Sequence, residues 1–315
     1  KNKAYIGVEL VPGTRRLALM NCLLHGMEGG DEGTVHLGNA LGQVGAGLDK
    51  ADIILANPPF GTSKGGEASI TRDDLTYDTS NKQLAFLQHI YRNLKPGGRA
   101  AVVLPDNVLF EAGKGTDIRR DLMHKCSLHT ILRLPTGIFY AQGVKTNVLF
   151  FTKGSATDDF QEENCTEHVW VYDLRTNMPS FGKRTPFNET HLKPFEALYG
   201  DNAKGHSERT EGDWNWCADN TDKSTETSRW RQFSREYIRE QKGDSLDISW
   251  LKDSDSVDAA DLPEPELLAA EAMGELTEAL RELDGLMQAL GAGEQAVAQK
   301  QLLADLLAMD VEVKL

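Results

Sequence analysis

Short apolar runs alternate with helical patterns through the first half of the chain, and this alternation restricts the fold more than any other feature. Apolar, β-branched runs bounded by turn residues predict strands, and apolar residues at every third or fourth position predict helices. The strands are expected at 4–11, 34–37, 52–56, 99–104, 129–134, 147–152 and 169–174, and the helices at 12–25, 80–94 and 117–125. This order predicts an α/β fold with a mostly parallel sheet, in which ligands bind beyond the carboxyl ends of strands.

Two local patterns add detail to the expected sheet. Residues 52–56 are dominated by Ile, Leu and Ala, which is typical of a parallel strand covered on both faces. The stretch Ser80-Asn81-Lys82-Gln83 fits a capping box, so the helix that follows is expected to begin there. We therefore expect a covered strand, a loop and then a helix with a defined start.

The strand at 52–56 ends in an unusual corner, Asn57-Pro58-Pro59-Phe60. Proline has no N–H and fixes φ, so the pair stops the strand and stiffens the turn. The side-chain carbonyl of Asn57 and the backbone carbonyl of Pro58 can then accept hydrogen bonds at one point, while Phe60 offers a flat apolar face. Two acceptors beside a ring suit the exocyclic amino group of a planar base, adenine N6 or less often cytosine N4. A proline turn with a packed Phe60 is the plain structural alternative.

The second half has a different texture, in which polar loops alternate with short elements. The stretch 200–228 is rich in Asp, Glu, Asn, Thr and Lys, which is typical of a mobile insertion. Trp214, Trp216, Trp230 and Trp250 are spread through this half. Aromatic rings can stack on nucleobases, but these have few basic neighbours. We therefore expect them to dock onto the first domain.

The chain becomes helical after Pro263 and Pro265. A heptad seam steps by four and three residues through Ala269, Met273, Leu276, Leu280, Leu283, Met287 and Leu290. Gly291-Ala292-Gly293 ends the seam, and a second helix is expected around Leu302 to Leu307. This hairpin can fold back on its own domain or bind a partner helix, and the sequence leaves both open.

Charge separates the two halves of the chain. The net charge is −14, made up of +3 over residues 1–152 and −17 over residues 153–315. The acidic half would repel a nucleic-acid backbone, so we expect a more basic partner to supply much of any affinity for DNA or RNA.

Cysteine usage and hydropathy limit the setting. The four cysteines are far apart and form no CxxC, which indicates neither a disulfide framework nor a zinc site and favours a reducing, cytoplasmic environment. No apolar run reaches eighteen residues and residues 1–4 do not read as a signal peptide, so no membrane association is expected.

The proline corner resembles the [D/N/S]-P-P-[Y/F/W] motif of S-adenosylmethionine-dependent amino-methyltransferases, which also follows a strand. Surrounding blocks narrow the family, namely YIGVELVPGTRRLALMNCLLHG, VHLGNAL, NPPFGT, TSNKQLAFLQHIYRNLKPGGRAAVVLPDNVLF and ILRLPTGIF. Together they resemble the modification subunit of type I restriction-modification systems, closely over residues 5–152 and more loosely beyond. The resemblance implies a doubly wound, Rossmann-like methyltransferase sheet and an adenine-N6 DNA methyltransferase.

The resemblance also implies a seat for the cofactor, S-adenosylmethionine. Glu9, followed by Leu10, would hydrogen-bond the ribose hydroxyls from the end of its strand. Asn39 and Ala40 would contact the adenine ring of the cofactor, and Asn57 would border the seat. The structural alternatives are that Glu9 is an exposed acid before a helix and that Asn39 stabilises a turn.

The same resemblance assigns the corner Asn57, Pro58, Pro59 and Phe60 to the target adenine. The implied mechanism is a direct in-line transfer in which N6 attacks the sulfonium methyl, with no covalent enzyme intermediate. N6 loses its proton once it is cationic, so no strong general base is needed, and catalysis comes mainly from positioning. The base must first leave the duplex.

One part of the family pattern has no counterpart in the sequence. The family's sheet begins with a strand that runs into a glycine-rich turn around the methionine part of the cofactor, and no such turn is found. In the family that strand lies between those ending here at Glu9 and Ala56. We therefore expect the chain to cover about the C-terminal three-fifths of such a subunit. We also expect a gap with unpaired backbone groups in its sheet, and weak or no cofactor binding by itself.

The resemblance implies three partners: a specificity subunit that reads the DNA sequence, a restriction subunit that cuts, and duplex DNA with a flipped adenine. The expected organisation is a methyltransferase domain over 1–200, a polar, Trp-containing extension over 201–262 and a helical tail for subunit association over 263–315. Two other functions stay open. One is an amino or amide methyltransferase for RNA or protein, whose relatives usually carry Tyr at the position of Phe60; the other is a non-catalytic scaffold.

Overall fold

The computed structural model describes residues 4–27, 29, 33–59, 70–139, 144–154, 165–211, 228–251 and 265–291. The chain divides into two units, residues 1–254 and residues 255–315. The first unit holds the described strands, and the second holds a long helix, α8 (Pro265–Ala289).

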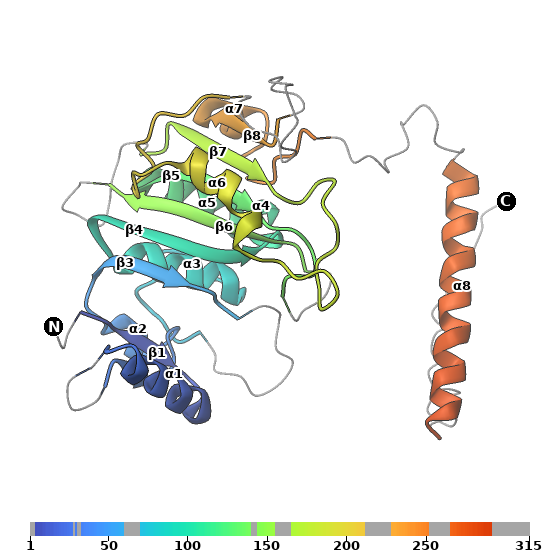
Figure 1. Ribbon diagram of the computed structural model, residues 1–315, viewed down its shortest axis with the longest axis horizontal. Helices are drawn as coiled ribbons and strands as arrows, with labels where there is room; N and C mark the ends of the chain where they lie inside the picture. Colours follow the sequence, from blue (N-terminus) through green and yellow to red (C-terminus); the bar gives the residue numbers. More distant parts are fainter. Residues whose placement is uncertain are drawn as a thin grey trace. The chain divides into compact units, whose positions relative to one another are not determined.

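A six-stranded sheet forms the body of the first unit, in the order β3-β4-β6-β5-β7-β8 (Figure 1). Its strands are β3 (Ala51–Ala56), β4 (Leu94–Pro105), β5 (Cys126–Arg133), β6 (Thr146–Lys153), β7 (His168–Asp173) and β8 (Trp230–Ser234). β3 pairs parallel with β4 and β5 with β7, whereas β6 runs antiparallel to both neighbours and β8 antiparallel to β7. The carboxyl ends of β3, β4, β5 and β7 therefore open at one edge of the sheet. The expected α/β fold with a mostly parallel sheet is confirmed.

Helices cover both faces of this sheet (Figure 1). The helices of the first unit that follow β3 are α3 (Lys82–Asn93), α4 (Asn107–Phe110), α5 (Lys114–Lys125), η1 (Glu189–His191), α6 (Lys193–Tyr199) and α7 (Arg235–Glu240). α3 and α5 share one buried cluster with alternate residues of the strands, and α6 shares the second cluster with the residues that point the other way. This alternation is what a sheet buried on both faces requires.

A small second sheet precedes the large one. β1 (Gly7–Glu9) and β2 (Val35–Leu37) pair in parallel and are joined by α1 (Pro12–Leu24), and α2 (Gln43–Ala46) follows. None of the residues of α1, all of which are described, is buried. β1 spans only the middle of the strand expected at 4–11, because its pairing with β2 extends over three residues.

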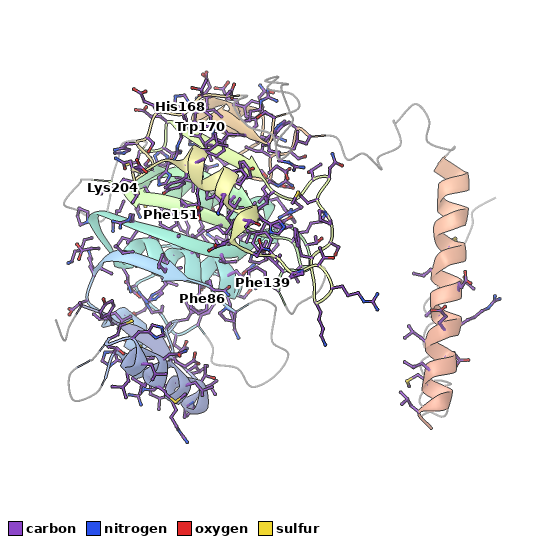
Figure 2. The ribbon with its side chains drawn as sticks, viewed as in Figure 1. Phe86, Phe139, Phe151, His168, Trp170 and Lys204 are labelled. Carbon is purple, nitrogen blue, oxygen red and sulfur yellow. The ribbon has the colours of Figure 1, made fainter. Side chains whose placement is uncertain are left out.

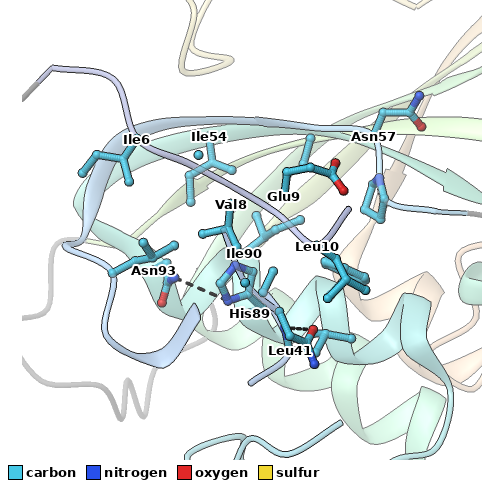
Figure 3. Close-up of a pocket in the computed structure, with 18 of the residues that line it drawn as sticks. Ile6, Val8, Glu9, Leu10, Leu41, Ile54, Asn57, His89, Ile90 and Asn93 are labelled. Atoms are coloured by element: carbon cyan, nitrogen blue, oxygen red, sulfur yellow. Dashed lines mark hydrogen bonds between the residues drawn. The ribbon is translucent and has the colours of Figure 1, made fainter. Parts of the chain in front are cut away.

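β1 and β3 face each other across a cavity of about 700 Å³ instead of pairing (Figure 3). Among the described strands, β2 is the partner of β1 and β4 the partner of β3, so the facing edges of both have no strand neighbour. The expected gap between the strands that end at Glu9 and Ala56 is therefore observed. The expectation that residues 52–56 form a strand covered on both faces is wrong. β3 is an edge strand, in which Leu55 is 78% and Ile53 48% exposed.

Helix α3 begins one residue later than a capping box at Ser80 would place it. Its N-cap is Asn81, whose side-chain oxygen accepts hydrogen bonds from the backbone N–H groups of Gln83 (2.9 Å) and Leu84 (3.2 Å). The capping-box interpretation is wrong in register, because Asn81 itself supplies the acceptor that the first turn needs.

The polar second half is more integrated into the fold than its composition suggests. Arg209 donates hydrogen bonds to the Thr130 hydroxyl and to the Tyr199 carbonyl, both at 3.0 Å. A mobile insertion is therefore the wrong description of residues 200–211, because they pack on the sheet. The remainder of that stretch, 212–227, lies outside the described residues.

The tryptophans that the structure describes dock onto the sheet, as expected. Trp230 is fully buried and stacks on Trp170 with ring centroids 4.9 Å apart, and Trp250 packs against Phe233. Figure 2 labels Trp170, which lies in β7. Trp214 and Trp216 lie outside the described residues.

Helix α8, taken by itself, carries the expected heptad seam on its surface. Met273, Leu276, Leu280, Leu283 and Leu290 are between 41% and 72% exposed. The helix ends before Gly291, which has a positive φ of 74°, and the expected second helix lies outside the described residues. No helix in the described parts of the chain is both long and apolar enough to cross a membrane.

Candidate active site

The cavity between β1 and β3 brings together the described residues that the sequence predicts to form the site (Figure 3). It is lined by Glu9, Leu10, Asn39, Ala40, Asn57, Pro58 and Pro59, among others. Phe60 lies outside the described residues. In Figure 3, Ile6 and Ile54 lie toward one end, and Glu9 and Asn57 toward the other. β1 and β3 thus run in the same direction, and both deliver their carboxyl ends to one end of the cavity.

Glu9 ends β1 and already engages one of its carboxylate oxygens. Its Oε1 accepts a hydrogen bond of 2.8 Å from the backbone N–H of Val11, the N-cap residue of α1. This bond fixes the start of α1, so Glu9 does act in part as the acidic residue before a helix that was the structural alternative. Its second oxygen makes no hydrogen bond to another described residue and can accept from a ligand hydroxyl.

The loop after β2 is held in place by its own turn and by a neighbouring segment. The Asn39 side-chain oxygen accepts from the backbone N–H of Leu41 (2.9 Å), which is the turn role foreseen as an alternative. The Leu41 carbonyl accepts from the Thr71 N–H (2.9 Å) and the Ala40 carbonyl from Arg72 (3.4 Å). The loop therefore presents a preformed wall to the cavity.

The proline corner sits at the carboxyl end of β3. Pro58 is buried, whereas Asn57 and Pro59 are exposed. The buried ring anchors the corner, so the Asn57 amide is held at the mouth of the cavity on a rigid support. The convergence of the Asn57 and Pro58 carbonyls on one base stays a prediction.

Sequence reasoning missed the contribution of α3 to this cavity. Lys82, Phe86, His89, Ile90 and Asn93 line it from one side of the helix. Their spacing of three and four residues is the signal that could have identified them, because such residues share a helix face.

His89 is the most unusual of these residues. Arg72 contacts its Nδ1 atom at 2.7 Å, and a guanidinium can only donate, so Nδ1 accepts and Nε2 carries the hydrogen. Burial, reinforced by the positive charge of Arg72, lowers the pKa of His89 to about 4. A neutral imidazole with a fixed tautomer therefore borders the cavity.

Arg72 is held in turn by an ion pair. Its guanidinium forms two hydrogen bonds of 2.5 Å to the Asp74 carboxylate, and these bonds lower the pKa of Asp74. Because Arg72 also contacts Ala40 and His89, it connects the segment after the proline corner to the loop after β2 and to α3. Neither burial nor these partners can be read from a local pattern.

These features define a class of protein. An α/β sheet in which the carboxyl end of one strand carries an acidic residue and that of another carries Asn-Pro-Pro has the arrangement of nucleotide-binding α/β proteins. Within the described residues, no group of three His, Cys, Asp or Glu side chains could hold a metal ion.

The chain belongs to the N-6 DNA methylase family, whose model matches residues 1–242. A second family model, described as the C-terminal domain of the type I restriction enzyme methylase subunit, matches residues 262–305. The family expected from the sequence motifs is therefore confirmed.

Individual relatives agree with this assignment. The chain is 65% identical over 315 residues to the type I restriction enzyme StySJI methylase subunit of Salmonella typhimurium strain LT2, and 64% identical over 317 residues to the EcoKI methylase subunit of Escherichia coli K12. Each match covers 96% of this chain and 59% of the relative, so the chain spans about three-fifths of the length of these relatives. A crystal structure of the EcoKI M protein superposes with a TM-score of 0.75 at 63% identity, covering 96% of this chain and 63% of that one.

Proposed function

We propose that this chain is part of the methylation subunit of a type I restriction-modification complex and transfers a methyl group from S-adenosylmethionine to adenine N6 in DNA. One observation supports the proposal above all: Glu9 and Asn57 line the same end of a single cavity (Figure 3). An acceptor for ribose hydroxyls and an acceptor for a base amino group thereby lie beside one reaction space.

The walls of the cavity suit the chemistry of the cofactor. Its volume of about 700 Å³ includes the gap between β1 and β3, so the volume is not a measure of the cofactor seat alone. The second carboxylate oxygen of Glu9 would accept from the ribose hydroxyls, and the wall formed by Asn39 and Ala40 would lie against the purine. S-adenosylmethionine supplies the electrophilic methyl group.

The proline corner would hold the target base. Asn57 and the Pro58 carbonyl would accept the two amino hydrogens of adenine, and Phe60 would stack on its ring. Two acceptors draw the nitrogen lone pair out of conjugation and aim it at the methyl carbon. The rigid corner thus acts by orientation and polarisation, and the proton leaves N6 after transfer.

Sequence recognition is assigned to a separate specificity subunit, and cleavage to a restriction subunit. The net charge of −17 over residues 153–315 supports this division, because such a chain is a weak general binder of nucleic acid. The exposed seam of α8 is the proposed contact for helices of the specificity subunit.

Methyl transfer from labelled S-adenosylmethionine to duplex DNA, with the specificity subunit added, tests the proposal. Asn57→Ala should lower transfer by at least about 100-fold, because an oriented acceptor in the transition state is lost. Asn57→Asp keeps an acceptor oxygen and is the matched control, expected to retain more activity than Asn57→Ala. Equal activity of the parent and Asn57→Ala would reject the proposed role of the corner.

Cofactor binding is tested separately by calorimetry. The chain by itself is expected to bind S-adenosylmethionine weakly, and micromolar binding would contradict that expectation. Glu9→Gln keeps an oxygen for the Val11 N–H but removes the charge, so it should weaken this binding by about a further tenfold. If this variant binds the cofactor as tightly as the parent, Glu9 acts only at the start of α1.

A further inference from the structure

A short bend at residues 182–185, here called the basic bend, presents Lys183 and Arg184 to solvent. We propose that this bend contacts the phosphate backbone of the duplex whose adenine enters the cavity between β1 and β3. The inference rests on the proposed function and identifies a DNA-binding surface for it.

The basic bend belongs to the edge of the sheet at which the active-site corner lies. It is part of the segment that leaves the carboxyl end of β7, and β7 runs parallel to β5. Asn57 follows the carboxyl end of β3, which opens at the same edge because β3, β4, β5 and β7 share one direction (Figure 1). A duplex that offers a base to Asn57 must therefore approach this edge.

The bend is anchored rather than loose. The backbone N–H of Gly182 donates to the Thr185 carbonyl at 2.9 Å, which closes the bend. Phe181, just before it, is 4% exposed and meets the rings of Phe187 (5.1 Å) and His191 (4.9 Å) edge to face. A bend held on such an anchor keeps its two cations in a fixed place, which lowers the entropy lost on binding.

A second contact joins the anchor to the loop after β5. The Phe181 N–H donates to the Thr136 carbonyl at 3.1 Å. Gly137, with φ +81°, lies so close that an added Cβ would be 2.0 Å from the Phe181 carbonyl oxygen. The two loops therefore form one surface at the active-site edge.

The two cations are available to a ligand. Both side chains are exposed, and neither takes part in an ion pair with another described residue. Arg175, earlier in the same segment, differs because its guanidinium is engaged with Asp106 at 2.7 and 2.9 Å. Arg133 is likewise engaged with Asp173 at 3.3 Å.

The local charge favours a polyanion. Residues 174–187 contain three basic residues and no Asp or Glu, although the half of the chain that holds them carries −17. A cationic bend against that background offers an attractive site beside repulsive surface, which suits a phosphate backbone that must be placed in one position. Arginine and lysine are the side chains that neutralise phosphates in such contacts.

The test compares the complex of this chain with its specificity subunit, carrying either the parent sequence or Lys183→Gln with Arg184→Gln. Fluorescence anisotropy with a labelled 30-base-pair duplex is recorded from 50 to 200 mM salt. Each lost phosphate contact reduces the slope of log K against log salt by about 0.9, so the double variant should lose about 2 in slope. Between 50 and 200 mM salt, the factor by which salt weakens binding should therefore be about ten times smaller for the double variant than for the parent. This difference should be the same for cognate and non-cognate duplexes.

Lys204→Gln is the matched control. Lys204 is also exposed, but its Nζ lies 3.7 Å from the position of a Cβ on Gly97, near the amino end of β4 and away from the active-site edge (Figure 2). This variant should bind DNA with the parent slope. A reduction as large as that of the double variant would overturn the proposal, because general charge would then explain both.

Other results also overturn the inference. An unchanged slope in the double variant does so, and so does loss of assembly with the specificity subunit on gel filtration, which would make the bend a subunit contact. If the parent complex binds DNA with the expected slopes but transfers no methyl group, the proposed function fails while the basic bend stands. If the parent complex does not bind duplex DNA, both fail.

Discussion

Individual side chains in this molecule are tuned by partners that lie far away in sequence. His89 accepts from Arg72, seventeen residues earlier, and His129 packs against Tyr199 with ring centroids 5.9 Å apart. Burial is the main cause that lowers the pKa of His89 to about 4 and that of His129 to about 3. Both imidazoles are therefore neutral in the folded chain well below neutral pH.

These two histidines make the folded state sensitive to mild acid. Unfolded histidine has a pKa of about 6.5, so between that pH and the folded values the unfolded state binds more protons. Stability contributed by the neutral rings is complete above about pH 6.5 and is lost as pH falls toward the folded pKa values. Each histidine should cost about 2 kcal/mol of unfolding free energy between pH 7 and pH 5.

Urea unfolding of the parent and of His89→Gln at the two pH values measures this effect. Glutamine keeps an acceptor for Arg72, and the variant should lose about 2 kcal/mol less than the parent on going from pH 7 to pH 5. Between pH 7 and pH 8 the two should behave alike. Parallel losses in both proteins at pH 5 would show that His89 does not carry the sensitivity.

Sequence reasoning succeeds at the residue scale where local order decides the place. Glu9 ends β1, Asn57 directly follows β3, and the two strands run in the same direction, so the resemblance to the family's sheet could predict their common location. His89 and Arg72 could not be assigned in the same way, because their state depends on burial and on each other. Asn39 is ambiguous from sequence, because an Asn at this position suits both a turn, which the structure shows, and a contact with a ligand in the cavity.

At the scale of elements, short-range patterns identify strands and helices but not their neighbours. A short apolar run marks the strand at 147–152, yet nothing in that run indicates that β6 inserts antiparallel between β4 and β5. The same limit explains β3. Its apolar composition is that of a covered strand, and its edge position follows from pairing that is not encoded locally.

Helix α8 exposes a continuous row of apolar side chains, which is typical of a surface that binds another helix. Leu276 and Leu283, one heptad apart, are 67% and 57% exposed. Replacing both with Asp should abolish co-elution with the specificity subunit on gel filtration, because a charge in a heptad seam must be desolvated on binding. The far-UV circular dichroism of the full-length variant should match that of the parent, because the fold of residues 1–254 should not change.

A matched control separates the seam from the helix as a whole. Glu278 is exposed on the same helix but outside the heptad positions, and Glu278→Ala should leave assembly intact. Association through the seam would be contradicted if the double Asp variant still formed the complex. It would also be contradicted if Glu278→Ala alone abolished the complex.

At the scale of the whole molecule, the first unit contains two sheets separated by a cavity. The comparison of strand order with the family anticipated this gap, whereas composition and periodicity alone did not. The gap leaves the large sheet with a well-buried centre, where Val102 and Phe151 are fully buried, and an exposed margin at β3. The loop that follows β2 in the small sheet is joined to a later segment by the hydrogen bond from the Thr71 N–H to the Leu41 carbonyl.

Because helix α1 is not covered by other elements, we expect local opening around it. With no buried residue of its own, α1 adds little to the free energy that keeps β1 and β2 together, so this region should open without global unfolding. Hydrogen–deuterium exchange followed by mass spectrometry should show amides of residues 7–37 exchanging at least about 100-fold faster than those of β4 and β6. Equal protection would mean that the small sheet opens only with the core. If the difference is found, the wall that carries Glu9 is the part of the cavity whose order a bound ligand would raise most.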